Sequence, residues 1–138
     1  MNARCIIGAA CAALAIATAM PAAAHDPGDV VTTHFEQAIP NIPGKTLTAQ
    51  IVDYPPGGAS VPHRHADSSF IFAYVLSGEI ESKVNDGQTQ IFRAGDSWHE
   101  PPASNHVVSR NASKTKPARL LAIVVADSDE KALTTNIE

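Results

Sequence analysis

The sequence predicts an all-β fold, a sandwich or barrel of short strands, on three observations. Runs of β-branched and aromatic residues recur along the chain and are separated by Gly, Pro and Asn. Several of these runs alternate apolar and polar side chains, which is the period of a half-buried strand. No segment keeps a helical period over three turns, and 138 residues suit one domain.

The expected strands follow one another closely. Residues 47–54 alternate apolar and polar side chains, whereas the apolar run over 70–76 is typical of a buried strand. Residues 79–84 and 88–93 are expected to pair as a hairpin, because Asn85-Asp86-Gly87 tolerates the positive φ angles of a tight turn. Further strands are expected near 97–99, 106–109 and 119–126.

The two ends of the mature chain are expected to lie outside the barrel. We expect a flexible N-terminal segment over 25–38, the barrel over 39–127 and a C-terminal tail over 128–138. Ser128 and Glu130 are placed to begin one short helix in this tail.

Residues 1–24 predict a secretory signal peptide. A short positive leader precedes an apolar run over 6–19, and small residues follow up to an expected cleavage near Ala24. The mature chain would then be periplasmic or secreted. A lipoprotein attached through Cys11 is the alternative, which is disfavoured because little apolar sequence precedes that residue. Cys5 and Cys11 both lie in this leader, so any metal site has only nitrogen and oxygen ligands.

The charge and hydropathy of the chain argue against nucleic acid and membranes as binding partners. The formal net charge is −4, and the one local basic cluster, Lys114 and Lys116, lies in a polar stretch typical of a solvated loop. Without a basic face, nucleic acid is not an expected partner. The apolar run over 6–19 is short for a membrane span, and we expect no membrane association of the mature form.

The triplet His63-Arg64-His65 is the strongest chemical signal. In an extended strand, residues i and i+2 face the same side, with Cα atoms about 6.6 Å apart. His63 and His65 can therefore direct two imidazoles at one point, and imidazole is the commonest metal-ligating side chain. His106 could supply a third ligand. His99 is expected in the core or beside the ligands, and His34 on a surface strand.

These residues resemble the two signature motifs of the cupin superfamily, and in particular its small single-domain cupin-2 members. The resemblance rests on Gly57 followed by His63-Arg64-His65, on Tyr74 to Gly78, on Ala94-Gly95-Asp96, and on Pro101-Pro102 before His106. It implies an RmlC-like jelly-roll barrel, a double-stranded β-helix, with a divalent transition metal (Fe, Ni, Cu, Mn or Zn) in its mouth. His63, His65 and His106 match the metal-binding histidines of the two motifs.

One residue departs from the family pattern. The family places a glutamate four or five residues after the second histidine, where this chain has Ser69 and Phe70. Glu100, just before Pro101-Pro102, is our candidate replacement, either as a distant ligand or as a general base beside a bound substrate. The alternative for Glu100 is a structural hydrogen bond at the barrel rim.

The resemblance implies chemistry on a small organic molecule. We expect an exported metal-binding cupin that is either a dioxygenase-like oxidoreductase acting on a chelatable substrate or a non-catalytic ligand-binding or sensory module. Isomerase, decarboxylase and hydrolase reactions use the same ligand set, and a barrel that has lost its metal is a third interpretation. Dimers through edge strands are common among such proteins, so a homodimer is left open. The aromatic candidates for the cavity wall, whose default role is packing in the core, are Phe70, Phe72, Tyr74, Phe92 and Trp98.

Overall fold

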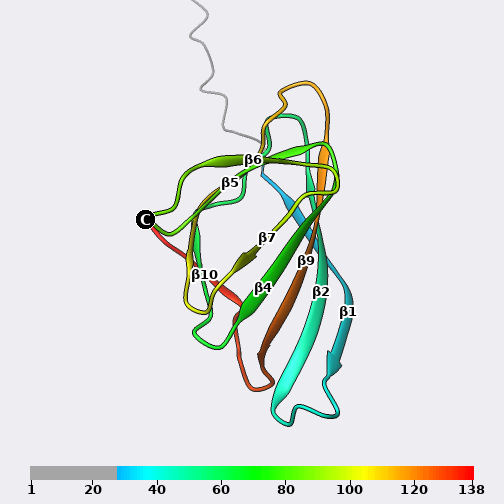
Figure 1. The fold of residues 1–138 in the computed structure, drawn as a ribbon, viewed down its shortest axis with the longest axis vertical. Coiled ribbons are helices and arrows are strands. Elements are labelled where there is room, and N and C mark those ends of the chain that lie inside the picture. The colour runs from blue at the N-terminus through cyan, green and yellow to red at the C-terminus, as the bar shows by residue number, and fades with distance from the viewer. Residues whose placement is uncertain (1–27) are drawn as a thin grey trace, which may run out of the picture.

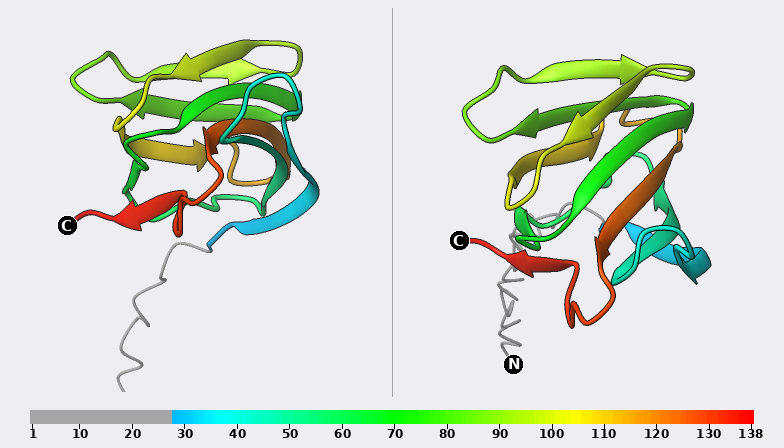
Figure 2. Two further views of the ribbon diagram at one scale, coloured as in Figure 1. Left: turned by 90° about the horizontal axis from the view of Figure 1, so that it is seen from below. Right: turned by 60° about the horizontal axis from the view of Figure 1, so that its bottom comes forward.

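Residues 28–138, which the computed structural model describes, form two five-stranded antiparallel sheets that face each other as a jelly-roll barrel (Figures 1 and 2). One sheet has the order β1-β2-β9-β4-β7 and the other β10-β3-β8-β5-β6. The strands are β1 (Val30–Ala38), β2 (Lys45–Tyr54), β3 (His63–His65), β4 (Phe70–Ser77), β5 (Glu79–Val84), β6 (Gln90–Arg93), β7 (Ser97–Glu100), β8 (Asn105–Asn111), β9 (Ala118–Asp127) and β10 (Thr134–Asn136).

The all-β prediction is confirmed, and the seven strands expected between residues 47 and 126 all form, as β2 and β4 to β9. Their bounds differ from expectation by two residues at most. Asn85, in the predicted hairpin turn, has a φ of 51°. The expected signal peptide over 1–24 lies outside the described residues. No helix among residues 28–138 is long and apolar enough to cross a membrane.

Two expectations for the ends of the barrel are wrong. Most of the expected flexible segment is strand β1, which pairs with β2 along its length. Because β1 is an edge strand whose nine residues are all exposed, no burial alternation marks it in the sequence. The tail forms strand β10 in place of a helix, and its pairing with β3 satisfies the backbone there.

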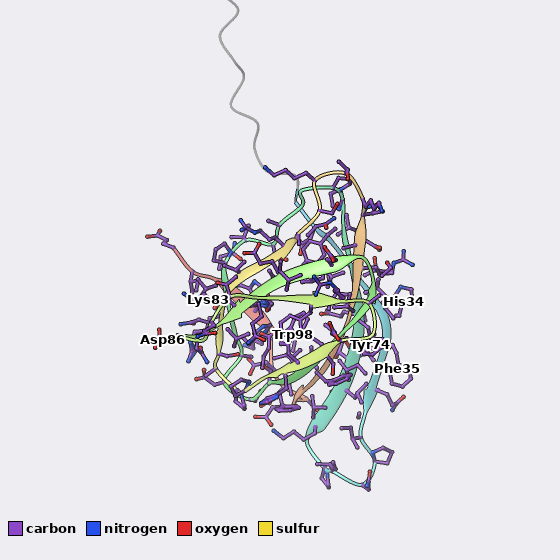
Figure 3. The ribbon with its side chains drawn as sticks, turned by 45° about the horizontal axis from the view of Figure 1, so that its top comes forward. His34, Phe35, Tyr74, Lys83, Asp86 and Trp98 are labelled. Atoms are coloured by element: carbon purple, nitrogen blue, oxygen red, sulfur yellow. The ribbon has the colours of Figure 1, made fainter. Side chains whose placement is uncertain are left out.

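His34 lies on exposed strand β1, as the sequence predicts. The register of β1 against β2 shifts between Thr33 and Phe35, which leaves His34 between two paired positions. Figure 3 shows His34 and Phe35 at the outer edge of the molecule.

The two sheets contribute different chemistry to the interior. The sheet containing β2, β4 and β9 buries mainly apolar side chains, whereas β8 of the opposite sheet buries polar ones. The buried apolar residues of the first sheet are Val52, Tyr54, Ile71, Ala73, Val75, Ala118, Leu120, Val124 and Ala126. The buried polar residues of β8 are His106, Ser109 and Asn111. The buried polar face of β8 therefore lies opposite an apolar wall, although Ile80 of β5 adds one apolar side chain to the core from the second sheet.

Gly78 carries the chain from β4 of one sheet to β5 of the other. Its φ is +74°, a conformation that strains residues with a Cβ. A Cβ at this position would also lie 2.7 Å from the Pro117 carbonyl oxygen and 2.8 Å from the Ala118 Cα. The sharp corner therefore depends on glycine for two separate reasons.

Gly44 provides a matched control for this corner, because its φ is +79° but a Cβ there would meet nothing within 4 Å. We predict that Gly44→Ala lowers the free energy of unfolding by about 1 kcal/mol, from backbone strain alone. Gly78→Ala should cost about 2 kcal/mol more, because the backbone must also move away from the new methyl group. Chemical denaturation of both variants measures this difference, and equal losses would contradict the proposed close packing at Gly78.

Candidate metal centre

Strand pairing brings the three predicted histidines together. His63 and His65 are the first and last residues of β3, and the β3–β8 register places His63 opposite His106. One ligand nitrogen from each ring lies within 4.8 Å of the others. The three side chains are partly or fully buried, so the chain presents three imidazoles to one point inside the barrel.

Hydrogen bonds to other residues orient two of these rings. His63 Nδ1 lies 2.8 Å from the Val61 carbonyl oxygen and donates to it, which leaves the Nε2 lone pair free. His106 Nε2 lies 2.9 Å from Ser82 Oγ, which leaves Nδ1 facing the cluster. Such partners on the remote nitrogen fix ring orientation in metal sites and raise the basicity of the ligand.

Glu100, the last residue of β7, adds a carboxylate to the cluster. Its side chain is 2% exposed. Glu100 Oε2 lies 2.7 Å from His65 Nε2, and Oε1 lies 3.3 Å from His106 Nδ1. Trp98, two residues earlier on the same strand, donates from its indole nitrogen to Oε1 over 3.1 Å. Figure 3 shows Trp98 within the body of the barrel.

Two atoms of the cluster are buried without a hydrogen bond. Although His65 Nε2 and Glu100 Oε2 lie 2.7 Å apart, their contact lacks hydrogen-bond geometry, and neither atom has another partner. Leaving a buried polar atom unpaired costs about 1–3 kcal/mol. A cation between the two would satisfy both, and three imidazole nitrogens with one carboxylate oxygen suit Zn, Fe, Ni, Cu or Mn. The residues present therefore fit a divalent transition metal.

The protonation states favour metal binding. Burial lowers the pKa of His106 to about 4, against the opposing effect of Glu100, and burial also lowers the pKa of His63. Both rings are therefore neutral at neutral pH, as ligands must be. Burial alone would raise the pKa of Glu100, but the contacts from His65, His106 and Trp98 lower it by more. Glu100 is therefore an anion.

The position of the usual family glutamate is not part of the centre. Ser69 is fully buried, and its hydroxyl donates to the Ala66 carbonyl oxygen over 2.9 Å, which closes the turn before β4. Phe70 is 45% exposed and stacks on His99 outside the barrel, with ring centroids 5.7 Å apart. The interpretation of His99 as a core or supporting residue is therefore wrong, because alternation along β7 turns it outward from Glu100.

The same alternation corrects the expected cavity wall. Phe70, Phe72 and Tyr74 lie on the outer face of β4, since Ile71, Ala73 and Val75 occupy the inner one. Phe92 and Trp98 do pack against the core, and their ring centroids lie 4.4 Å apart. Small and aliphatic side chains line the cavity in place of all five of these aromatic residues.

A cavity of about 380 Å³ opens beside the histidines. Its volume falls within the usual range for small-molecule sites. Side chains from both sheets line it. They include His63, His65, His106 and Glu100 on one side, apolar residues Val52, Ile71, Ala73, Leu120, Ala122 and Val124, and the hydroxyl residues Tyr54, Ser60 and Ser109.

Sequence reasoning missed Tyr54, Ser60 and Ser109 as cavity residues. Tyr54 is the last residue of a predicted strand. Whether its side chain points into the barrel depends on the register of that strand, which the sequence pattern did not reveal. Ser109 lies three residues after His106, a spacing that places two residues on opposite faces of a regular strand. A bulge makes Val107 an extra residue, because His106 pairs with Val84 and Val108 with Lys83. His106 and Ser109 therefore both face inward.

The fold and the site define a jelly-roll barrel whose three histidines could hold a metal. Residues 50–124 match the family described as "Cupin_2: Cupin domain", and the chain belongs to this family. It is 32% identical over 111 residues to Phomopsin biosynthesis cluster proteins C' and D of Diaporthe leptostromiformis. That match includes 78% of this chain but 56% of each relative, so the chain spans about half their length.

Solved structures agree on the fold. An uncharacterized conserved protein with a double-stranded β-helix domain from Klebsiella pneumoniae superposes with a TM-score of 0.61 and 18% identity, over 83% of this chain and 89% of its own. Oxalate oxidase in complex with the substrate analogue glycolate superposes with a TM-score of 0.61 and 21% identity, over 82% of this chain and 57% of its own. The Cnp3 cupin domain of Schizosaccharomyces pombe superposes with a TM-score of 0.59 and 20% identity, over 72% of this chain and 62% of its own. At these identities the likeness concerns the fold alone.

The lowered pKa of His106 predicts an acid-sensitive metal-free protein. Between about pH 6.5 and 4, the unfolded chain binds a proton at this residue and the folded chain does not, so stability falls as the pH falls. The low pKa of Glu100 acts in the same direction at more acidic pH. Urea denaturation of chelator-treated protein at several pH values should show this loss of unfolding free energy. In His106→Gln the free energy of unfolding should fall less steeply with falling pH, and an unchanged pH dependence would contradict the lowered pKa of His106.

Proposed function

We propose that this chain is an exported metalloprotein in which His63, His65, His106 and Glu100 hold one divalent transition ion beside a small-ligand cavity. This proposal rests mainly on the buried contact between His65 Nε2 and Glu100 Oε2, which lie 2.7 Å apart and make no hydrogen bond. Neutral imidazoles with an adjacent carboxylate form a ligand set, whereas as a purely structural cluster they would leave buried polar atoms unsatisfied.

Glu100 would take the role of the glutamate that the family usually has after the second histidine, although Glu100 lies on a different strand, β7. Three neutral imidazoles leave the full charge of a divalent ion uncompensated, and one carboxylate reduces that charge. The Trp98 indole N–H donates a hydrogen bond that holds Glu100 beside the imidazoles of His65 and His106. When ligand binds, Glu100 Oε2 can instead accept the proton that a coordinating hydroxyl gives up. Both roles require the carboxylate, and only the first requires direct metal contact.

The cavity supports an organic ligand with an apolar body. The wall contributed by β4 and β9 includes Ile71, Leu120 and Val124, which disfavour a compact dianion that must stay hydrated or paired. We therefore do not assign the substrate named for oxalate oxidase to this chain. A β-diketone, enol or phenol could coordinate through its oxygens and place its carbon skeleton against the apolar wall. A bound metal would act there as a Lewis acid that lowers the pKa of the coordinating oxygen.

We favour dioxygenase-like oxidoreductase chemistry at this site, with the non-catalytic binding or sensory module as the second candidate. The cavity beside the histidines leaves space for a substrate, which supports the enzyme. Support for the module comes from Glu100, because a fourth protein ligand leaves fewer positions on the metal for reaction partners. Export follows from the predicted signal peptide over 1–24, and a homodimer stays a prediction.

The proposed ligands predict that metal is lost only from variants of the centre. Purified wild-type protein should carry about one transition ion per chain by elemental analysis, and His63→Ala should lose most of it. Glu100→Gln should bind metal about 10-fold or more weakly, because a charged ligand or close counter-charge is removed. His34→Ala is the matched control, since His34 lies on exposed strand β1 and should leave metal content unchanged. Equal metal content in wild type and His63→Ala would refute the centre.

Oxygen uptake separates the enzyme from the binding module. Metal-loaded protein is mixed with a β-diketone or a catechol in an oxygen electrode, with the His63→Ala variant as the blank. Uptake that requires the loaded centre supports the oxygenase. Tight, metal-dependent ligand binding without uptake would instead favour the module.

A further inference from the structure

A second polar group lies in the cavity, apart from the metal centre. Tyr54, at the end of β2, is 2% exposed, and its hydroxyl contacts two serines. Ser109 Oγ of β8 lies 2.7 Å from the Tyr54 hydroxyl, and Ser60 Oγ lies 2.8 Å from it on the other side. Ser60 in turn contacts Asp29 Oδ2 over 2.5 Å. Four residues thus form one continuous chain of hydrogen bonds, and all four line the cavity.

The direction of this chain is determined by its outer end. Ser60 Oγ donates its only hydroxyl proton to Asp29 Oδ2, because a carboxylate oxygen accepts. Ser60 must therefore accept from Tyr54, whose hydroxyl proton points toward Ser60. Tyr54 then has only a lone pair for its other partner, so Ser109 donates to Tyr54. Burial raises the pKa of Tyr54 to about 12, which keeps this hydroxyl protonated.

The inner end of the chain is consequently an acceptor. Ser109 Oγ has given its proton to Tyr54 and makes no other hydrogen bond within residues 28–138. Ser109 lines the cavity together with His63, His65 and His106, so its remaining lone pairs can accept from a group placed there. The bulge at Val107 is what turns Ser109 to the same side as His106.

A purely structural role accounts for only part of this arrangement. A buried tyrosine hydroxyl needs a partner, and one serine would provide it. The second serine and the carboxylate add a fixed direction, and they present an acceptor to the ligand space. Asp29 lies at the outer end of the hydrogen-bond chain, where the neighbouring backbone at Gly28 passes close to the loop after β2. A Cβ on Gly58 would lie 2.9 Å from the Gly28 carbonyl oxygen.

We propose that Ser109, oriented by Tyr54, Ser60 and Asp29, is a second polar subsite that accepts a hydrogen bond from the ligand. This inference rests on the proposed function of the cavity and adds the class of ligand. The ligand has an oxygen-bearing chelating end at the histidines, an apolar body against β4 and β9, and a hydroxyl or N–H group at Ser109. A ligand with an ether or carbonyl in that position is discriminated against, because two acceptors meet.

The test uses benzoylacetone as a chelating probe, with its meta- and para-hydroxy and meta- and para-methoxy derivatives. Dissociation constants are measured by calorimetry on metal-loaded protein, so the readout does not depend on turnover. We expect at least one hydroxy isomer to bind wild type about 5-fold tighter than benzoylacetone, the effect of one neutral hydrogen bond. The matching methoxy isomer should gain nothing.

Two variants separate orientation from simple contact. Ser109→Ala should remove the preference for the hydroxy isomer. Tyr54→Phe keeps the ring but frees the Ser109 proton, so Ser109 can donate as well as accept. In this variant the methoxy isomer should gain affinity relative to benzoylacetone, a result that a structural role would not produce. Thermal unfolding and metal content of each variant show that it is folded and loaded.

The outcomes distinguish the subsite from the proposed function. Equal binding of all derivatives to wild type, with affinity lost in His63→Ala, overturns the subsite and leaves the metal-dependent ligand site standing. A hydroxy preference that survives in Ser109→Ala likewise overturns the subsite. Affinities that do not depend on His63, or the absence of any binding, overturn both proposals together.

Discussion

The pairing of β3 with β8 is the constraint on which the centre depends. This short ladder sets His63 opposite His106 and places His65 beside the Glu100 carboxylate from the other sheet. A strand of three residues cannot hold its position alone, and β10 pairs with its other edge. Residues from distant parts of the chain therefore converge because the C-terminal segment holds β3 in place against β8.

The division of the interior explains why a centre and a cavity coexist. One sheet buries aliphatic side chains, and the opposite sheet presents imidazoles and hydroxyls. Buried polar groups are tolerated only when they are satisfied, and most of these are paired within the barrel. Four buried side-chain atoms within residues 28–138 have no partner: Ser104 Oγ and Asn105 Oδ1, and the adjacent pair His65 Nε2 and Glu100 Oε2, which lies where a cation would fit. The unpaired atoms of His65 and Glu100 thus mark a place where a bound cation would satisfy two buried polar groups at once.

The sequence predicted the fold and named all four polar groups of the centre, His63, His65, His106 and Glu100, as candidates. Alternation and turn residues identified seven strands, and i, i+2 spacing placed His63 and His65 on one face. Edge strand β1 was missed because nothing buries its side chains. Phe72 was assigned to the wrong face, since an apolar run does not reveal its register. Ser109 could not be found, because the bulge at Val107 depends on the partner strand.

The central claim is that one ion shares the three histidines and Glu100. A crystal structure of the metal-loaded protein, with anomalous diffraction data at the absorption edge of its metal, tests this most directly. The account predicts one peak about 2.0–2.2 Å from His63 Nε2, His65 Nε2 and His106 Nδ1, with the Glu100 carboxylate alongside. A peak elsewhere, or no peak with His65 and Glu100 joined by a linear hydrogen bond, would contradict it.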